Sequence, residues 1–266
     1  MRIGFIGGGK MAEAMIAGMM ARNIVRPGDI LAADISEERR AWLSRQHGIS
    51  ATAANKDVIA HGLVLVLAVK PQQLADVLRE LAPIVTSGHL VMSIAAGRAT
   101  DWIEERLPKG RVVRVMPNIA CLAGEGMSVF TRGSRATEGD ATAVRGLLEC
   151  CGRTMELPEP LFDSVTALSG SGPAFFAYLL DRLVDGAVRE GLPRKEALLL
   201  AAQTMLGTAR LLLDKGIEPA DLAASVTSAK GTTAEGRKEL ETDIVAEALR
   251  RTISAATRRS RELSRG

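Results

Sequence analysis

The sequence predicts an α/β protein in two parts, in which a doubly wound parallel sheet is followed by an all-helical domain. Over the first 158 residues, short aliphatic runs alternate with helical segments, which is the pattern of parallel strands joined by crossover helices. Beyond the two prolines of Pro158-Glu159-Pro160, every segment has helical periodicity. We therefore place the domain boundary between residues 158 and 159, with the helical domain covering 159–266.

Composition narrows the class of protein. The 266 residues include 47% hydrophobic but only 3% aromatic residues, so the core must be aliphatic. The net charge of +3 is small and both signs are interspersed, which argues against a nucleic-acid partner. The three cysteines have neither metal-ligand spacing nor an even count, which predicts a reducing compartment and no metal. The N-terminus has no apolar run long enough for export or a membrane span, so we expect a cytoplasmic protein.

A glycine-rich turn follows the first expected strand. Residues 2–6 have the composition of a short buried strand, and 11–22 have the apolar spacing of a helix. The six residues Gly7 to Ala12 between and within them read G-x-G-x-x-A. In a dinucleotide site the first glycine permits the turn, the second lets the backbone approach a pyrophosphate, and the small third residue packs helix on strand. The alternative is a purely structural glycine turn.

The second expected strand, 30–33, ends at Asp34. A dinucleotide fold places its ribose-reading residue at this distance from the glycine turn. A carboxylate there would accept hydrogen bonds from the ribose hydroxyls and repel a 2′-phosphate, which favours NADH over NADPH. Arg39 and Arg40 follow and could reverse this preference, although they also suit the solvated first turns of a helix.

Further strands are expected at 63–69, 89–94, 111–116 and 127–131, and a helix at 141–151. The aliphatic run at 63–69 is typical of a central parallel strand that is covered on both faces. The first three of these strands end in small or turn-forming residues, namely Lys70-Pro71, Ala95-Ala96-Gly97 and Pro117-Asn118. Because the carboxyl ends of such strands border the ligand crevice, a narrow crevice for a flat ring is predicted.

Four helices of the second part are expected from their periodicity and end signals. One starts around Gly170 to Pro173, a second has Pro193 as its first residue and stops before Gly216, a third opens at Pro219, and the last covers 243–263. These segments carry more apolar surface than one small helical domain needs to cover itself. We therefore expect an intimate homodimer.

The stretch Ser228 to Thr233 combines small residues with hydroxyls. Thr232 and Glu235 have the spacing of a capping box, which would open a helix at this point. The free N–H groups and positive dipole end of such a helix suit a carboxylate or a phosphate. Simple capping by Ser228 and Thr232 is the alternative interpretation.

Seven segments together resemble the pyrroline-5-carboxylate reductases, the enzymes that make proline. In chain order they are Ile3 to Gly9, Ala68 to Gln72, Ser93 to Gly97, Arg114 to Asn118, Gly124 to Met127, Val165 to Ala174 and Ser228 to Thr233. They run in the family's order and span nearly the whole chain. The resemblance implies a Rossmann-type domain for NAD(P)H, followed by an all-α domain that interlocks with a second subunit near the substrate site.

The resemblance also implies roles for individual residues. The pyrophosphate would lie at Gly7, Gly9, Lys10 and Met11, and the adenosine at Asp34 and Asn55. The nicotinamide would lie along Ala68 to Pro71, with Ala95, Met116 and Asn118. Met11 and Met116 are equally consistent with core packing. The residues expected at the cofactor are Ile6, Gly7, Gly8, Gly9, Lys10, Met11, Asp34, Asn55, Ala68, Val69, Lys70, Pro71, Ala95, Met116 and Asn118. Those expected at the substrate are Ser228, Lys230, Gly231, Thr232 and Thr233.

The implied chemistry is hydride transfer from nicotinamide C4 to the imine carbon of 1-pyrroline-5-carboxylate, which gives L-proline. Backbone N–H groups of the loop would hold the carboxylate and Thr233 would reach the ring nitrogen. A protonated imine is already a strong hydride acceptor, so the enzyme needs orientation more than a dedicated acid. None of the three histidines lies near the loop in sequence, and solvent would supply the proton.

Three positions depart from the family's pattern. Lys10 replaces the usual asparagine, and Ala229 and Lys230 replace proline and glycine in the substrate loop. The loop either keeps its path at modest strain or is reshaped, and Lys230 either adds a cation for the carboxylate or points to solvent. Two further hypotheses therefore stay open: reduction of a related cyclic imino acid such as the six-membered homologue, and a dinucleotide-binding scaffold or sensor without turnover.

Overall fold

The computed structural model describes residues 1–265, which form two compact units. The first unit holds residues 1–171 together with the chain from Ala256 onward, and the second holds residues 172–255. The predicted domain boundary between 158 and 159 stays a prediction, because a domain of a fold family and a compact unit need not coincide. In this chain the segment 159–171 packs with the first unit.

The first unit is built on one eight-stranded sheet with the order β3-β2-β1-β4-β5-β6-β7-β8. Every neighbouring pair is parallel except β6 and β7, which are antiparallel. The order reverses at β1, so the carboxyl ends of β1 and β4 flank the switch point at which α/β sheets bind ligands. The strands are β1 (Ile3–Ile6), β2 (Ile30–Ala33), β3 (Ser50–Thr52), β4 (Val64–Leu67), β5 (Leu90–Ser93), β6 (Arg111–Met116), β7 (Gly126–Arg132) and β8 (Gly152–Glu156).

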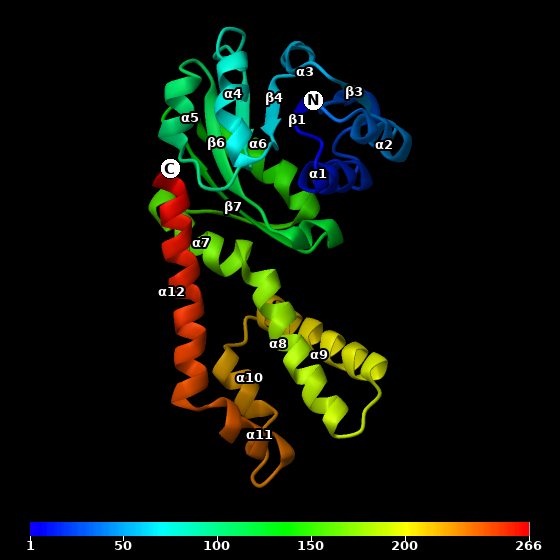
Figure 1. Ribbon diagram of the computed structural model, residues 1–266, viewed down its shortest axis with the longest axis vertical. Helices are drawn as coiled ribbons and strands as arrows, with labels where there is room; N and C mark the ends of the chain where they lie inside the picture. The colour runs from blue at the N-terminus through cyan, green and yellow to red at the C-terminus, as the bar shows by residue number, and fades with distance from the viewer. Residues whose placement is uncertain (266) are drawn as a thin grey trace. The chain divides into compact units, whose positions relative to one another are not determined.

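Helices cover both faces of this sheet (Figure 1). The core on one face is formed with α1, α2 and α6, and the core on the other with α3, α4 and α5. The alternation of the strands explains the two cores, since Val64 and Val66 of β4 enter one and Leu65 and Leu67 the other. The helices are α1 (Lys10–Ala21), α2 (Glu37–His47), α3 (Asn55–His61), α4 (Pro71–Leu81), α5 (Thr100–Arg106) and α6 (Glu138–Leu148).

The predicted strands are present. β2 and β6 have the predicted bounds, while β1, β4 and β5 are one to three residues shorter than predicted. Sequence patterns did not predict β3 and β8, which lie at the two ends of the sheet. An edge strand is covered less than a central one, so β8 alternates between half-buried and exposed residues and carries no continuous aliphatic run.

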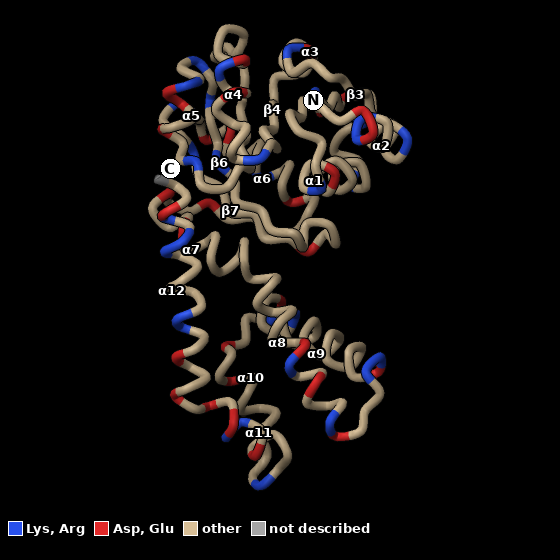
Figure 2. Tube along the Cα trace, in the orientation of Figure 1, with Lys and Arg blue, Asp and Glu red and all other residues tan. Residues whose placement is uncertain are grey.

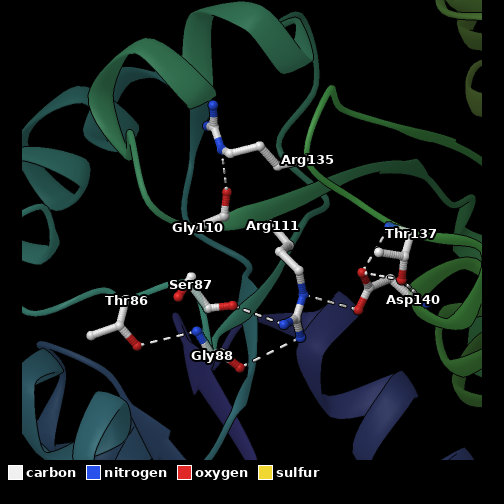
Figure 3. Close-up of polar contacts among 8 residues, drawn as sticks. All are labelled: Thr86, Ser87, Gly88, Gly110, Arg111, Arg135, Thr137 and Asp140. Carbon is white, nitrogen blue, oxygen red and sulfur yellow. Dashed lines mark hydrogen bonds and ion pairs between the residues drawn. The ribbon is translucent and has the colours of Figure 1, made fainter.

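The amino end of β6 is fixed by a polar network that lies opposite the ligand-binding edge (Figure 3). Arg111 donates from Nη1 to the carbonyl oxygen of Ser87 at 2.8 Å and from Nε to Asp140 Oδ1 at 3.2 Å. Asp140 also accepts hydrogen bonds from the backbone N–H and hydroxyl of Thr137, both at 2.8 Å, in the capping box of α6. Because this network joins a loop, a strand and a helix, we assign it to stabilising the fold.

A short helix, a π-turn and a long helix follow the sheet. α7 (Phe162–Val165) continues into the π-turn Thr166–Gly170, and α8 (Gly172–Arg189) then opens the second unit. The second unit also contains α9 (Arg194–Lys215), α10 (Pro219–Ser225), α11 (Thr232–Leu240) and the first part of α12 (Asp243–Arg265). Pro193 lies one residue before α9 and does not begin it, whereas Gly216 ends that helix in the left-handed conformation, with φ 64°.

The second unit leaves most of its large apolar side chains exposed. α9 has no charged residue from Ala197 to Ala209, so most of this helix is drawn in tan, the colour of residues other than Lys, Arg, Asp and Glu, in Figure 2. It is also the one helix of residues 1–265 that is long and apolar enough to cross a membrane by length and composition, a test that core helices of soluble proteins also pass. An exposed apolar surface of this kind marks an interaction site. Its exposed members include Phe176, Tyr178, Leu183, Leu198, Leu199, Leu200, Leu206, Leu213 and Ile244.

Candidate active site: a dinucleotide cleft and a threonine loop

A cleft of about 620 Å³ lies at the carboxyl ends of β1, β2 and β4, where the sheet order reverses. Half of its lining residues come from the expected cofactor set. These are Gly7, Gly9, Asp34, Asn55, Ala68, Val69 and Lys70. The side of the cleft along α4 adds Gln73, Asp76, Val77 and Glu80.

Glycine stands at each of the three positions of the first turn for a different physical reason. Gly7 has φ 95°, and a Cβ there would lie 2.7 Å from the carbonyl oxygen of Ala68 on the neighbouring strand end. A Cβ on Gly8 would lie 2.7 Å from Cδ1 of Leu43 on α2. At Gly9, by contrast, a Cβ would meet nothing within 4 Å. Gly7 and Gly8 therefore serve packing, while Gly9 leaves open the space that a pyrophosphate needs, so the residues fit a dinucleotide.

The N-terminus of α1 supplies hydrogen-bond donors at this point. Gly9 precedes the helix with an extended backbone, and its carbonyl oxygen accepts the first helical hydrogen bond, from the N–H of Glu13 at 3.0 Å. The N–H groups of the first turn have no partner inside a helix. They and the helix dipole suit the negative charge of a pyrophosphate.

Asp34 lies between the glycine loop and the start of α2. Its Oδ2 accepts the N–H of Gly8 at 2.8 Å, and its Oδ1 accepts the N–H of Ser36 at 2.9 Å. Each carboxylate oxygen can accept a second hydrogen bond, so both remain able to receive ribose hydroxyls. The carboxylate thus occupies the backbone N–H groups of Gly8 and Ser36.

The structure corrects the interpretation of Arg39 as a solvated helix residue. Its side chain is only 19% exposed and forms an ion pair with Glu13 of α1, with 2.5 Å between Nη2 and Oε2. The neighbouring Arg40 donates to the carbonyl oxygens of Asp34, at 2.8 Å, and Ile35, at 3.1 Å. Both guanidinium groups therefore bind backbone oxygens within the first unit.

The remaining expected cofactor residues do not line this cleft. Ile6 and Ala95 are buried in the sheet core, and Pro71 lines a second cavity of about 630 Å³ together with Ala96 and Gly97. Both ends of the Asn118 side-chain amide have partners: its Nδ2 donates to the carbonyl and hydroxyl oxygens of Ser169, at 3.2 and 3.3 Å, and its Oδ1 accepts the N–H of Met127 at 3.2 Å.

The end of β6 is therefore joined to the π-turn Thr166–Gly170. A Cβ on Gly170 would lie 2.5 Å from Cε of Met116, so a larger residue in the turn would require the end of that methionine side chain to move. π-turns within helices are often found at functional sites. This one positions Met116 and Asn118 at the ligand-binding edge of the sheet.

In the second unit, Ser228 to Gly231 form a tight turn, closed by the hydrogen bond from the N–H of Gly231 to the carbonyl oxygen of Ser228 at 3.0 Å. Lys230, the third residue of the turn, has φ 60°. The loop therefore keeps a path that favours glycine, at the modest strain of one side chain in the left-handed region. A Cβ on Gly231 would collide with the hydroxyl of Ser228.

The predicted capping box at Thr232 and Glu235 is wrong. Gly231 is the N-cap residue, with an extended backbone, and α11 begins at Thr232 without a side-chain cap. Thr232 is thus the first helical residue, and Glu235 pairs with Lys238 at 2.7 Å. The N–H groups of the first turn of α11 consequently have no capping side chain that occupies them.

Comparisons with known proteins agree over the whole chain. Residues 159–263 match the family described as pyrroline-5-carboxylate reductase dimerisation, and residues 2–97 match the family described as NADP oxidoreductase coenzyme F420-dependent. The pyrroline-5-carboxylate reductase of Methanosarcina acetivorans is 43% identical over 99% of this chain and 98% of its own. This chain belongs to the pyrroline-5-carboxylate reductase family.

Two further members of the family show how widely the likeness extends. Rat pyrroline-5-carboxylate reductase 3 is 40% identical, over 99% of this chain and 96% of its own. The solved pyrroline-5-carboxylate reductase of Coxiella burnetii superposes with a TM-score of 0.93 at 32% identity, over 99% of this chain and 98% of its own. The Rossmann-type fold with a helical second part, predicted from the sequence, is thereby confirmed.

Several residues that shape this reductase site were not predicted. Glu13 and Ser169 gave no sequence signal, because their partners, Arg39 and Asn118, are distant in the chain. Arg237 of α11 donates from Nη1 to the hydroxyl of Thr227 at 3.0 Å, just before the loop. An arginine on an exposed helix face is common, so only the structure reveals this contact.

Proposed function

We propose that this protein reduces 1-pyrroline-5-carboxylate to L-proline with NAD(P)H, the last step of proline biosynthesis. The observation that carries the proposal is the 43% identity over essentially the full length of both chains with a pyrroline-5-carboxylate reductase. The dinucleotide, when bound, supplies the hydride that the imine carbon accepts. The protein's own residues bind and orient the two reactants.

Binding of the dinucleotide falls to the first unit. Gly9 and the N-terminus of α1 would hold the pyrophosphate, and Asp34 and Asn55 would lie at the adenosine. Since Asp34 repels a 2′-phosphate and occupies the nearby donors, NADH is the preferred cofactor in this proposal. The solved Plasmodium falciparum pyrroline carboxylate reductase, 27% identical, has NADP bound. The preference for NADH that we propose for this chain rests on Asp34.

Binding of the imino acid falls to the loop of the second unit. The N–H groups at the start of α11 would hold the carboxylate, with the hydroxyl of Ser228 beside them. The hydroxyl of Thr233 would hold the ring nitrogen, and the ammonium of Lys230 would add positive charge for the carboxylate. A proton on the imine nitrogen would come from solvent.

Thr233→Val should lower kcat about tenfold or more, because the variant loses one hydrogen bond to a charged group in the transition state. The shape of the side chain is retained, so the fold should survive. Steady-state kinetics checks this, with Thr233→Ser as the matched control that keeps the hydroxyl. Unchanged kinetics in the valine variant would remove Thr233 from the mechanism.

Two variants of Lys230 separate the effect of its backbone strain from the effect of its positive charge. Lys230→Ala keeps a Cβ at φ 60° but removes the ammonium, and we expect a severalfold higher KM for the imino acid. Lys230→Gly removes the Cβ as well, so it should show the same KM and resist urea slightly better than the alanine variant. If both variants keep the original KM, Lys230 points to solvent and binds no carboxylate.

We also propose that the protein is a homodimer and that it lies in the cytoplasm. The exposed apolar side chains of α8 and α9 lie within the segment that matches the dimerisation family, and a second subunit would cover them. Light scattering on the purified protein would count the subunits and distinguish a dimer from a larger assembly. A monomer would contradict this part of the proposal.

The substrate is tested by comparing ring sizes. Turnover of 1-pyrroline-5-carboxylate and of its six-membered homologue should differ in favour of the five-membered ring, with L-proline as the identified product. A preference for the six-membered ring would instead support a reductase of a related cyclic imino acid. If no cyclic imine causes NAD(P)H oxidation, the chain is a dinucleotide-binding scaffold or sensor.

A further inference from the structure

We propose that Arg39 is a positioning residue that orients the peptide groups of the dinucleotide loop, and that it does not bind the 2′-phosphate of a cofactor. An arginine soon after the second strand could serve either purpose. The inference rests on the proposed function in one respect only, namely that the cleft between β1 and β4 binds NAD(P)H. The contacts of Arg39 within the first unit carry it.

The guanidinium of Arg39 lies against the back of the glycine loop. Its Nε donates to the carbonyl oxygen of Gly8, and its Nη2 lies 3.4 Å from the carbonyl oxygen of Gly9. The side chain is 19% exposed, and Arg39 is not among the residues that line the cleft, whereas Gly9 is. The arginine therefore contacts the loop but does not itself line the cleft.

The geometry of the peptide group shows what the two contacts of Arg39 do to the loop. In a trans peptide the C=O and N–H of one plane point in opposite directions. The carbonyl of Gly8 shares its plane with the N–H of Gly9, and the carbonyl of Gly9 shares its plane with the N–H of Lys10. Because Arg39 holds both carbonyls, it turns both N–H groups away from itself. These two N–H groups are among those that a pyrophosphate would accept.

Glu13 fixes Arg39 in this position. Its side chain is 15% exposed and accepts hydrogen bonds from Arg39 Nη2 at 2.5 Å and from Trp42 Nε1 at 3.2 Å. Burial alone would raise the pKa of Glu13, but the hydrogen bonds from Arg39 and Trp42 outweigh it and lower the pKa. Glu13 is therefore charged at neutral pH and neutralises the guanidinium. His47 Nε2, at 3.8 Å, and Lys10 Nζ, at 3.9 Å, complete its surroundings.

The alternative role requires a cation that is free to meet a 2′-phosphate. Arg39 is paired with Glu13 and bound to two carbonyls, and Asp34 stands at the ribose position with its oxygens on the N–H groups of Gly8 and Ser36. Asp34 lines the cleft, whereas Arg39 is not among its lining residues. The geometry thus predicts that Arg39 affects binding of the pyrophosphate, which NADH and NADPH share.

The test measures binding of both cofactors to three variants of the full chain. Dissociation constants of NADH and NADPH are obtained from the change in nicotinamide fluorescence on binding, for Arg39→Met, Arg39→Lys and Arg40→Met. Arg40→Met is the matched control, since it removes a neighbouring cation of α2 that binds only the carbonyls of Asp34 and Ile35. Urea unfolding of each variant without cofactor reports the fold.

Arg39→Met should weaken NADH and NADPH by the same factor, about tenfold, because both lose the same oriented donors. The kcat at saturating cofactor should stay near the original value, and Arg40→Met should bind NADH normally. Arg39→Lys should recover part of the affinity, since one ammonium cannot reproduce the planar fork on two carbonyls.

Two results would overturn the inference. Loss of NADPH affinity with unchanged NADH affinity would make Arg39 a 2′-phosphate ligand, and unchanged affinity for both would give it no role in the loop. These results differ from failure of the proposed function, in which the unaltered protein itself binds neither cofactor. That last result would remove the inference as well.

Discussion

Replacement of Gly7 by alanine is expected to abolish measurable NAD(P)H binding and to destabilise the sheet. The new Cβ would lie 2.7 Å from the carbonyl oxygen and 2.8 Å from the carbonyl carbon of Ala68, which are backbone atoms that no rotamer change can move. The residue also has φ 95°, a conformation that side chains rarely adopt. The loop must therefore separate from the end of β4, and the cleft loses the close contact between two of its lining segments. Cofactor fluorescence and urea unfolding measure the two effects.

Gly9→Ala is the matched control for this prediction. A Cβ at Gly9 meets nothing within 4 Å, and the backbone there is extended, so the stability without cofactor should be unchanged within about 0.5 kcal/mol. The methyl group would nevertheless occupy the space that the pyrophosphate needs, so affinity should still fall. If Gly9→Ala binds NADH as tightly as the original protein, the pyrophosphate does not lie at Gly9.

Replacement of Glu159 by alanine should lower the free energy of unfolding of the first unit by about 3–5 kcal/mol, since it leaves a buried charge unpaired. Glu159 Oε1 lies 2.9 Å from Nη1 of Arg114, whose side chain is only 6% exposed and stacks on the ring of Phe162. The same carboxylate accepts the N–H and hydroxyl of Thr100, at 2.9 and 2.5 Å, and so caps α5.

Urea unfolding followed by tryptophan fluorescence measures this effect, because Trp102 lies on the helix that Glu159 caps. Glu159→Gln keeps an acceptor for Thr100 and should lose less than the alanine variant. Asp76→Ala removes an exposed ion pair with Arg79 within the first unit and should cost less than about 0.5 kcal/mol. Equal losses for Glu159→Ala and Asp76→Ala would show that the buried pair contributes no more than a surface pair.

The parts of the fold that could be predicted are those with a local signal. The glycine turn, the central strands and the helices of the second unit are each recognisable within about ten residues of sequence. β3 and β8 escaped prediction because edge strands need no continuous aliphatic run. The capping box failed because Gly231, with its extended backbone, takes the N-cap position that the spacing gave to Thr232.

The supports of the site could not be predicted, because they join residues that are far apart in the chain. Glu13 and Arg39 are separated by 26 positions, and Thr100 and Glu159 by 59. Sequence periodicity gives the face on which a charged residue lies but not its partner on another element. The path of the substrate loop stays open for a local reason, since Ala229 and Lys230 permit two backbone paths, and φ 60° at Lys230 shows which one the chain adopts.

The central claim is tested most directly by one spectrophotometric measurement. The purified protein is mixed with 1-pyrroline-5-carboxylate and either NADH or NADPH, and oxidation of the cofactor is followed together with formation of L-proline. We predict one L-proline for each cofactor oxidised, with a higher kcat/KM for NADH, because Asp34 lines the cleft and its carboxylate would repel a 2′-phosphate. A clear preference for NADPH would contradict the role given to Asp34, and absence of cofactor oxidation would contradict the proposed reaction itself.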